Sequence, residues 1–314
     1  MKNFIVNFYQ CQYNLSLWII GYTVIILSGY CILNHLKSIE QQYWNFNETN
    51  EKETDANDDH NMPFIFIGGH KNSGTGLMGI ILDAHSMIRC AHQPVVTMDL
   101  LRYRSNRENS MVRLLESGIT VSVLNDATAA FIATVIKEMG PNAQRLCHKD
   151  PESFYYLEDL NNLFPKAKFI HMVRDGRVTV ASKIANIVDT NNTLDNITEA
   201  ILLWDEKTAQ ILEECEYIGN ERCITIRYEC LVLNPRKTIQ KILHFLDLPW
   251  EERLLRYNET HKLIHNNSLD VWLKTTSDPL MEHILFMNQI SEQLRKLNYY
   301  SEEIPPNYNI ICND

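Results

Sequence analysis

The chain has 314 residues, of which 45% are hydrophobic and 22% are charged, and this length can bury one sizeable core or at most two small ones. Its 39 acidic residues outnumber its 29 lysines and arginines, so the formal net charge is −10. That balance argues against a nucleic-acid partner with a broad contact surface, but it is compatible with a local basic pocket for a small anion.

The first element in the chain is an uncharged apolar run over residues 15–33, LSLWIIGYTVIILSGYCIL. As a helix it would be about 28 Å long, which is close to the hydrocarbon thickness of a bilayer. A cleaved signal peptide is the alternative, but the run is longer than the usual signal core and no small-residue cleavage site follows it. We therefore expect a short cytoplasmic tail over residues 1–14, a membrane anchor over 15–33 and a polar, acidic stem over 34–61.

The flanking charges Lys2 and Lys37 are too few to set the orientation of this run in a membrane. Five N-glycosylation acceptor patterns after the run favour a lumenal location for the rest of the chain. The acceptors are Asn47, Asn191, Asn196, Asn258 and Asn266. Cys215 and Cys223 bracket a short polar turn that could close as a bridge, with buried free thiols as the alternative. Together these features predict a single-pass type II protein whose residues 62–314 form a lumenal domain.

From Pro63 onward, short β-rich runs alternate with helical segments. We expect strands over 64–67, 168–173 and 223–227, and helices over 73–84, 126–139, 152–163, 178–187, 198–215 and 235–246. Asn125 is the expected cap of the second helix and Gly140-Pro141 its end, whereas the stretch after Ala84 is expected to be irregular. The alternation predicts an α/β fold, with a central parallel sheet covered by helices on both faces.

The stretch FIFIGGHKNSGTGLMGIILDAH, residues 64–85, predicts a phosphate-binding loop. Gly69 and Gly74 have the spacing that lets successive backbone N–H groups point inward, and the following helix adds the partial positive charge of its N-terminus. A nucleoside triphosphatase would carry a lysine and then a hydroxyl residue where this chain has Thr75 and Gly76. The loop therefore indicates a different anion, and a plain strand-turn-helix is the alternative.

Three polar residues lie at positions where α/β folds commonly bind ligands. Arg174 leaves the strand over 168–173, Ser182 lies eight residues further on, and Lys149 in LCHKDP precedes an Asp-Pro turn. Each of them alone is more often a surface group than a ligand-binding one. In combination with the glycine loop they indicate one anion pocket, and no metal site is indicated.

In that combination the chain resembles the protein-tyrosine sulfotransferases. The matching blocks follow the family's order over most of residues 63–308 and read FIGG, SGT, LM, ILDAH, RC, LCHKDP, LFPKAKFIHMVRDGRVTV, CITIRYECLVLNPRKTIQKILHFLDLPW and PPNY. The family is type II, Golgi-resident and homodimeric. The resemblance implies sulfonate transfer from 3'-phosphoadenosine-5'-phosphosulfate (PAPS) to tyrosines of acidic peptides or proteins in the Golgi lumen.

The resemblance also implies roles for individual residues. It assigns Ser73, Gly74 and Thr75 to the 5'-phosphosulfate, Arg174 and Ser182 to the 3'-phosphate, Tyr228 to a cofactor contact and Lys149 to the departing phosphate oxygen. It pairs Cys90 with Cys147 and Cys215 with Cys223. A loosely matching stretch, NNSLDVWLKTTSD, places Ser268 and Lys274 where the family has a late cofactor loop.

The chain departs from the family at the transferring group and at the base. Asn72 stands where the family has an arginine, with Lys71 as a neighbouring cation, and Gly76 replaces a second threonine. After Cys90 the family reads Gly-Glu-Glu-Thr-Arg, and Gln93 replaces the glutamate that acts as base. His92 has a suitable reference pKa of roughly 6.5 and is a candidate substitute base, with an ordinary loop histidine as the alternative. A pseudoenzyme that retains the pocket, or a sulfotransferase for another acceptor such as a glycan, are the rival functions.

Overall fold

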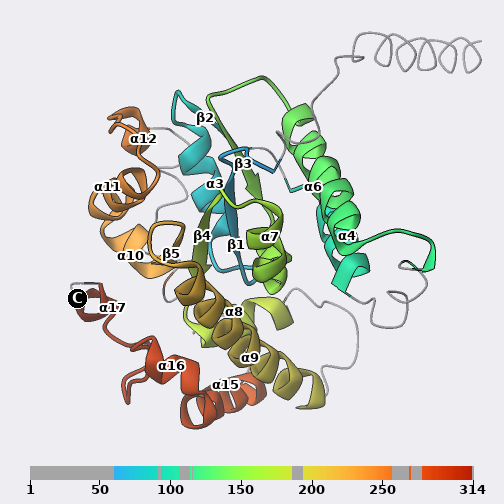
Figure 1. Ribbon diagram of the computed structural model, residues 1–314. Helices are drawn as coiled ribbons and strands as arrows, with labels where there is room; N and C mark the ends of the chain where they lie inside the picture. Colours follow the sequence, from blue (N-terminus) through green and yellow to red (C-terminus); the bar gives the residue numbers. More distant parts are fainter. Residues whose placement is uncertain are drawn as a thin grey trace, which may run out of the picture. The chain divides into compact units, whose positions relative to one another are not determined.

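Figure 1 shows the computed structural model, which describes residues 60–90, 93–105, 114, 116–185, 194–256, 269 and 278–312. Ala56–Asp314 forms one compact unit, to which these residues belong. The expected anchor over residues 15–33 lies outside the described part. Within the described part, no helix combines the length and the apolar character that a membrane span needs.

The core of the fold is a parallel sheet of five strands in the order β2-β3-β1-β4-β5 (Figure 1). In chain order the strands are β1 Ile65–Gly69, β2 Ile88–Cys90, β3 Arg145–Lys149, β4 Lys168–Val173 and β5 Cys223–Arg227. From β1 the chain moves to one side of the sheet, toward β2, and from β4 it moves to the other side, toward β5. The carboxyl ends of β1 and β4 therefore flank the crevice where open α/β sheets bind ligands.

Helices cover both faces of this sheet, because side chains alternate along each strand. Ile65 and Ile67 of β1 pack with α3 Thr75–Asp83, α10 Tyr228–Leu233 and α11 Pro235–Phe245. Phe64 and Phe66 lie in the opposite cluster, which α6 Val121–Glu138, α7 Leu157–Leu163 and α9 Leu194–Ile218 cover. A third cluster joins α9 to α8 Gly176–Ala185, α15 Asp278–Ile290, α16 Glu292–Lys296 and α17 Tyr308–Ile311. The sheet with helices on both faces agrees with the expected α/β fold.

Several local expectations were wrong at element boundaries. Helix α6 begins at Val121 and is capped by Thr120, whose hydroxyl accepts from the Val123 N–H at 3.3 Å, so Asn125 lies inside the helix. The first turn escaped notice because Val121 and Val123 are exposed and set no apolar period. The expected helix over 152–163 is divided into the 3-10 helix η1 Pro151–Tyr156 and the helix α7.

Other elements were missed altogether. The stretch after Ala84 contains β2 and the helix α4 Val95–Ser105, and β3 precedes the Asp-Pro turn. Strand β3 reads RLCHK and buries His148, so no run of apolar residues indicated it. The helices α10, α12 Arg253–Arg256, α15, α16 and α17 were not expected either.

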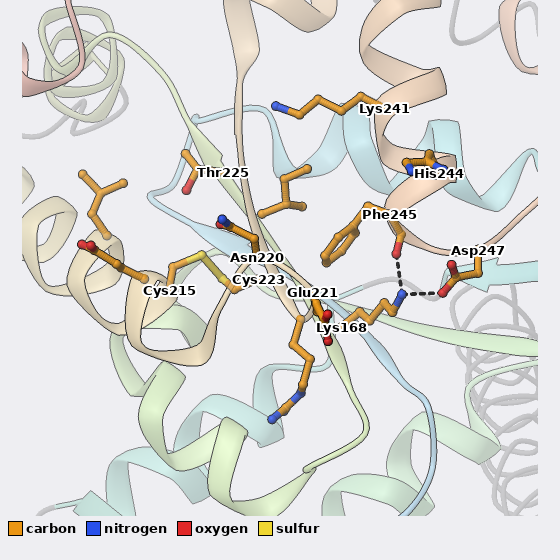
Figure 2. A pocket seen from close by; sticks show the side chains of 14 residues that line it. Lys168, Cys215, Asn220, Glu221, Cys223, Thr225, Lys241, His244, Phe245 and Asp247 are labelled. Atoms are coloured by element: carbon orange, nitrogen blue, oxygen red, sulfur yellow. Dashed lines mark hydrogen bonds and ion pairs between the residues drawn. A yellow bond between two sulfur atoms is a disulfide. The ribbon is translucent and has the colours of Figure 1, made fainter.

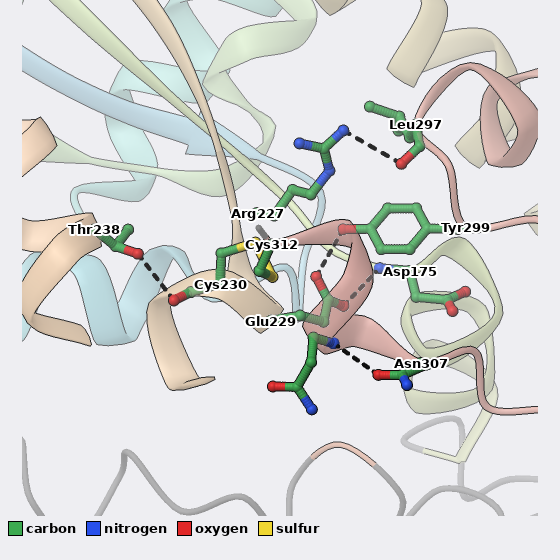
Figure 3. The surroundings of a disulfide bond; sticks show 10 residues. Asp175, Arg227, Glu229, Cys230, Thr238, Leu297, Tyr299, Asn307 and Cys312 are labelled. Carbon is green, nitrogen blue, oxygen red and sulfur yellow. Dashed lines mark hydrogen bonds between the residues drawn. A yellow bond between two sulfur atoms is a disulfide. The ribbon is translucent and has the colours of Figure 1, made fainter. Parts of the chain in front are cut away.

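Three disulfide bridges join elements of the fold. Both expected bridges are present: Cys90–Cys147 links β2 to β3, and Cys215–Cys223 links α9 to β5. A third bridge, Cys230–Cys312, fastens the C-terminal helix α17 to α10 (Figure 3). Its cysteines are 82 positions apart in sequence, so no local pattern indicated the pair.

Candidate active site

The loop between β1 and α3 is held in a narrow turn at the carboxyl edge of the sheet. Gly69, Asn72 and Gly74 have φ angles of 143°, 66° and 99°, a region that glycine enters freely and asparagine tolerates. A Cβ at Gly69 would lie 2.3 Å from the Met172 carbonyl, and one at Gly74 would lie 2.4 Å from the Tyr228 ring. The glycines therefore let the loop lie directly against β4 and α10.

Ser73 and the start of α3 supply unused hydrogen-bond donors. Ser73 is only 1% exposed, and its Oγ has no hydrogen-bond partner among the described residues. Helix α3 has Gly74 as its N-cap, no side chain caps it, and its first turn carries no acidic residue. A buried unpaired hydroxyl beside an uncapped helix N-terminus forms a suitable cradle for a phosphate or sulfonate group.

Arg174 and Tyr228 close the other side of this crevice. The Arg174 guanidinium lies 4.3 Å from the centroid of the Tyr228 ring, and its Nη1 donates to the Asn72 carbonyl at 3.1 Å. The arginine thereby bridges the end of β4, the glycine loop and the start of α10. Ser182 lies half-buried on α8, which begins two residues after Arg174. The structure thus brings the loop, Arg174 and Tyr228 into contact, and the cofactor roles of these residues and of Ser182 stay predictions.

A buried polar network lies next to Arg174 and Tyr228 in the chain, and Figure 3 shows the part of it around Glu229. The Asp175 N–H donates to Glu229 Oε1 at 3.0 Å, and the Tyr299 hydroxyl donates to Glu229 Oε2 at 2.6 Å. Arg177 Nη2 and the Tyr308 hydroxyl donate to Asp175 Oδ2 at 2.7 and 3.0 Å. Burial raises the pKa of the Glu229 carboxyl, an effect that the hydrogen bond from Tyr299 opposes. Because Asp175 directly follows Arg174 and Glu229 directly follows Tyr228, the network restrains the two residues that are expected to contact the cofactor.

The C-terminal part of the chain therefore helps to build the site. Tyr299 lies after α16 and Tyr308 begins α17, and the Cys230–Cys312 bridge fastens α17 next to Glu229. No local pattern predicted this support. The signals present in the sequence were the charged residues beside Arg174 and Tyr228, since buried charges are rarely left unpaired, and the block PPNY, which ends at Tyr308.

Lys149 ends the neighbouring strand and packs against α3. It ends β3 opposite Ile67 of β1, and a Cβ at Gly79 of α3 would lie 3.4 Å from its Cγ. The aliphatic part of the side chain therefore runs beneath α3, on the face of the sheet where the glycine loop enters that helix. Lys71, by contrast, is 59% exposed and pairs with Glu152 of η1 at 3.2 Å. The expected cation beside Asn72 is thus engaged with a carboxylate.

Gln93, at the position of the family's base, contacts Asp150, which was expected only as part of the Asp-Pro turn. Its Nε2 donates to Asp150 Oδ1 at 3.1 Å. Asp150 is fully buried, and its Oδ2 has no hydrogen-bond partner among the described residues. Burial raises the pKa of Asp150 to about 6, although the hydrogen bond from Gln93 acts to lower it. The directly preceding Lys149 was the signal that could have drawn attention to this carboxyl.

The remaining candidates have no described side chain. His92 and Ser268 lie outside the described residues, as do four of the glycosylation acceptors, Asn47, Asn191, Asn258 and Asn266. Asn196 lies in the first turn of α9. The roles assigned to these residues stay predictions.

A large pocket of about 1000 Å³ lies elsewhere, at the opposite end of the strands (Figure 2). It is lined by Lys168 and Cys223, which begin β4 and β5, and by Lys241, His244 and Phe245 of α11. Lys168 donates there to the Phe245 carbonyl and to Asp247. Since the glycine loop follows the carboxyl end of β1, this pocket is separate from the candidate active site.

Comparison with known proteins agrees with the geometry. A model of the sulfotransferase family matches residues 63–252. Protein-tyrosine sulfotransferase A of Caenorhabditis elegans is 32% identical over 281 residues, which cover 84% of this chain and 74% of the relative. Protein-tyrosine sulfotransferase 2 of Gallus gallus is 33% identical over 274 residues, covering 79% of this chain and 72% of the relative. The Drosophila melanogaster enzyme is 42% identical over 202 residues, 63% of this chain and 40% of its own length.

Solved structures support the fold. The sulfotransferase domain of the olefin synthase of Synechococcus PCC 7002 superposes with a TM-score of 0.50 at 22% identity, over 73% of this chain and 94% of that domain. The family match extends over more than half of the chain, and the Caenorhabditis elegans and Gallus gallus relatives are matched over 74% and 72% of their length. The chain therefore belongs to the sulfotransferase family and, within it, to the protein-tyrosine sulfotransferases.

Proposed function

We propose that this protein transfers sulfonate from PAPS to tyrosine hydroxyls of secretory-pathway proteins. The observation that carries the proposal is the cradle formed by the buried, unpaired Ser73 hydroxyl at the uncapped start of α3. Arg174, stacked on Tyr228, faces it across the crevice between β1 and β4. A protein-tyrosine sulfotransferase needs such a pair of anion sites, because PAPS carries a 5'-phosphosulfate and a separate 3'-phosphate.

Each residue of the cradle has a distinct electrostatic task. PAPS supplies the activated sulfonate when it is bound. The Ser73 hydroxyl and the first N–H groups of α3 would donate to the phosphosulfate oxygens, and Arg174 with Ser182 would hold the 3'-phosphate. Lys149 would place its cation at the phosphate oxygen that takes up charge as the sulfur departs. Removing one such preorganised donor typically lowers kcat by about 10²- to 10³-fold.

Acceptor and location complete the proposal. We infer acidic, tyrosine-containing peptides or proteins as acceptors, since the named relatives are protein-tyrosine sulfotransferases. A Golgi membrane location with a lumenal domain is supported by the apolar run over residues 15–33 and by the glycosylation acceptors that follow it. Homodimers are expected from the family resemblance.

The replacements at Asn72 and Gln93 favour a second candidate, a pseudoenzyme that binds the cofactor without turnover. Asn72 contributes its carbonyl to Arg174 and brings no charge to the transferring group. Gln93 brings an amide where a base is required. The same replacements also allow a sulfotransferase that acts on another acceptor, such as a glycan.

A transfer assay with the full-length protein separates these functions. The protein is incubated with labelled PAPS and an acidic tyrosine peptide, the same peptide with phenylalanine in place of tyrosine, or a glycan acceptor. Label on the tyrosine peptide alone is the expected result. Calorimetry with 3'-phosphoadenosine-5'-phosphate (PAP) completes the test: PAP binding that Arg174→Ala abolishes, without transfer to any acceptor, indicates the pseudoenzyme. Label on the glycan indicates the other acceptor class, and binding of neither nucleotide contradicts all three.

A further inference from the structure

Gln93 replaces the glutamate that, by the family resemblance, would accept the proton during sulfonate transfer. An amide cannot serve as that acceptor, because its conjugate acid is far too strong. The Gln93 side chain is, however, hydrogen-bonded to a carboxyl group, with 3.1 Å between its Nε2 and Asp150 Oδ1. We propose that Asp150 accepts the proton of the acceptor hydroxyl in this chain. This inference rests on the proposed sulfonate transfer.

The surroundings of Asp150 pair its carboxyl only in part. Asp150 occupies the N-cap position of η1, and its side chain makes no regular capping hydrogen bond there, although the Glu152 backbone N–H lowers its pKa. Its Oδ1 receives the amide of Gln93, whereas its buried Oδ2 has no hydrogen-bond partner among the described residues. A buried carboxylate oxygen without a partner destabilises the fold, so such a group requires another reason, and a catalytic role is one of the few.

The backbone places Asp150 suitably with respect to Lys149. Asp150 has φ −143° and ψ 117°, so the extended conformation of β3 continues through it and the two consecutive side chains point to opposite sides. Lys149 runs beneath α3, on the side of the glycine loop. In an in-line displacement the nucleophile and the leaving group also lie on opposite sides of the sulfur. The Asp150 carboxyl and the Lys149 ammonium group are adjacent in sequence, and their side chains leave the strand in opposite directions.

Gln93 connects the buried carboxyl to the surface. The Gln93 side chain is exposed, whereas Asp150 is fully buried, so the carboxyl lies one hydrogen bond below a solvent-exposed residue. A general base acts either in direct contact with the hydroxyl or through one water molecule. The proposal requires that the Gln93 amide moves aside, or that a water beside it relays the proton, so that the acceptor hydroxyl comes within that reach.

The charged groups around Asp150 give a basicity suited to this task. Burial raises the pKa of Asp150 to about 6. The Gln93 amide, the Glu152 backbone N–H and Lys149 lower this pKa, and the Glu152 carboxylate raises it. Lys71 is held by Glu152, and β1 contributes only the Ile67 carbonyl, which accepts from the Asp150 N–H at 3.2 Å. The charged residues of α4 pair elsewhere, as Asp99–Arg102 and Arg104–Asp159. The carboxyl is therefore ionised near neutral pH and remains basic enough to take a proton.

The proposed step is balanced in atoms and electrons. The phenol oxygen donates an electron pair to the sulfur of PAPS as the bond between sulfur and the bridging phosphate oxygen breaks. That bond's electron pair stays on the 5'-phosphate of the departing PAP. The phenol proton moves to the Asp150 carboxylate, which releases it to solvent after the products leave.

The test measures kcat/KM for an acidic tyrosine peptide against pH with the full-length protein. For the wild type we expect the rate to rise with pH up to a plateau, with a midpoint of about 6. Asp150→Asn keeps the volume and an oxygen for the Gln93 amide but removes the basicity. We expect it to lower kcat about 10²-fold or more and to abolish this midpoint, while PAP binding, measured by calorimetry, persists.

Two neighbouring variants provide a readout that a merely structural role would not move. Gln93→Leu removes the hydrogen bond that lowers the pKa of Asp150, so the midpoint should move to higher pH. Glu152→Gln removes the carboxylate that raises this pKa, so the midpoint should move to lower pH. Absence of both shifts overturns the inference, even if Asp150→Asn fails to fold.

The other outcomes are also decisive. An Asp150→Asn variant that keeps more than a tenth of the wild-type rate overturns the assignment of Asp150 alone. Loss of the midpoint in His92→Ala, with Asp150→Asn unaffected, assigns the base to His92 instead. A wild-type protein that binds PAP but transfers no sulfonate to tyrosine at any pH overturns the proposed function together with this inference.

Discussion

Three glycines of this chain allow the effects of backbone strain and close packing at the loop after β1 to be measured separately. Gly74 has φ 99°, and a Cβ there would lie 2.4 Å from Cδ2 of Tyr228. Gly118 has φ 78°, but a Cβ there meets nothing within 4 Å. Gly76 lies in the first turn of α3 with the same open space around it. Substitution of each by alanine therefore adds the same methyl group to three different environments.

The expected changes in the free energy of unfolding follow from these environments. Gly76→Ala should stabilise the protein by about 0.5–1 kcal/mol, because alanine loses less backbone entropy than glycine in a helix. Gly118→Ala should destabilise it by about 1–2 kcal/mol, the usual energy of a left-handed residue with a Cβ. Gly74→Ala carries that same strain, and displacing the buried Tyr228 ring adds about 1–3 kcal/mol of overpacking. Its total cost is then about 2–5 kcal/mol.

Gly74→Ala should also weaken cofactor binding, because the displaced ring no longer supports Arg174. A cation–π contact is worth about 0.5–2 kcal/mol, which corresponds to a roughly two- to thirtyfold loss of PAP affinity. Urea unfolding of the three variants gives the stabilities, and calorimetric titration with PAP gives the affinities. If Gly74→Ala unfolds like Gly118→Ala and binds PAP like the wild type, the contact between Gly74 and Tyr228 does not shape the site.

Three further predictions concern the cofactor clamp, the third disulfide and acid stability. Arg174→Lys cannot both stack on Tyr228 and donate to Asn72, so PAP affinity should fall about tenfold to a hundredfold by calorimetry; an unchanged affinity would contradict the clamp. Serine replacement of both cysteines in Cys230–Cys312 should lower the free energy of unfolding by about 4.5 kcal/mol, against about 2.5 kcal/mol for Cys215–Cys223, because the bridges close loops of 82 and 8 residues; equal losses in urea unfolding would refute this. Burial lowers the pKa values of His148 and His171 to about 3, below the value of about 6.5 in the unfolded chain. The contribution of the two neutral imidazoles to the free energy of unfolding is therefore complete above about pH 6.5 and is lost as the pH falls below it. Between about pH 7 and 5 each should lose about 2 kcal/mol, offset in part by about 1 kcal/mol from the raised pKa of Asp150; urea unfolding at both pH values checks the net loss, and equal stabilities would count against buried neutral histidines.

The local part of the site could be read from short sequence patterns. Strands β4 and β5 have the predicted bounds, because each is a continuous β-rich run between turn or helix signals. The loop after β1 was predicted from its glycine spacing alone, and Gly69 and Gly74 do adopt the backbone angles that this spacing implies. Chemistry that depends on neighbouring residues in the chain, such as an anion cradle at a helix start, is therefore visible in the sequence.

Contacts between distant segments depended on the tertiary structure. Strand β3 reads RLCHK and has no apolar pattern that could be recognised in the sequence. It is buried because it lies between β1 and β2 in the sheet. The bridge between Cys230 and Cys312, and the tyrosines that support Arg174 through Asp175 and Glu229, join segments that are distant in the chain. The hydrogen bond between Gln93 and Asp150 is of the same kind. The sequence by itself determined the α/β fold and the phosphate loop, because these follow from local periodicity and spacing, and it indicated the family through the resemblance of its ordered motif blocks. Only the tertiary structure showed which carboxyl lies next to Gln93, the residue at the position of the family's base. That contact depends on how the connection between β2 and α4 packs against the end of β3.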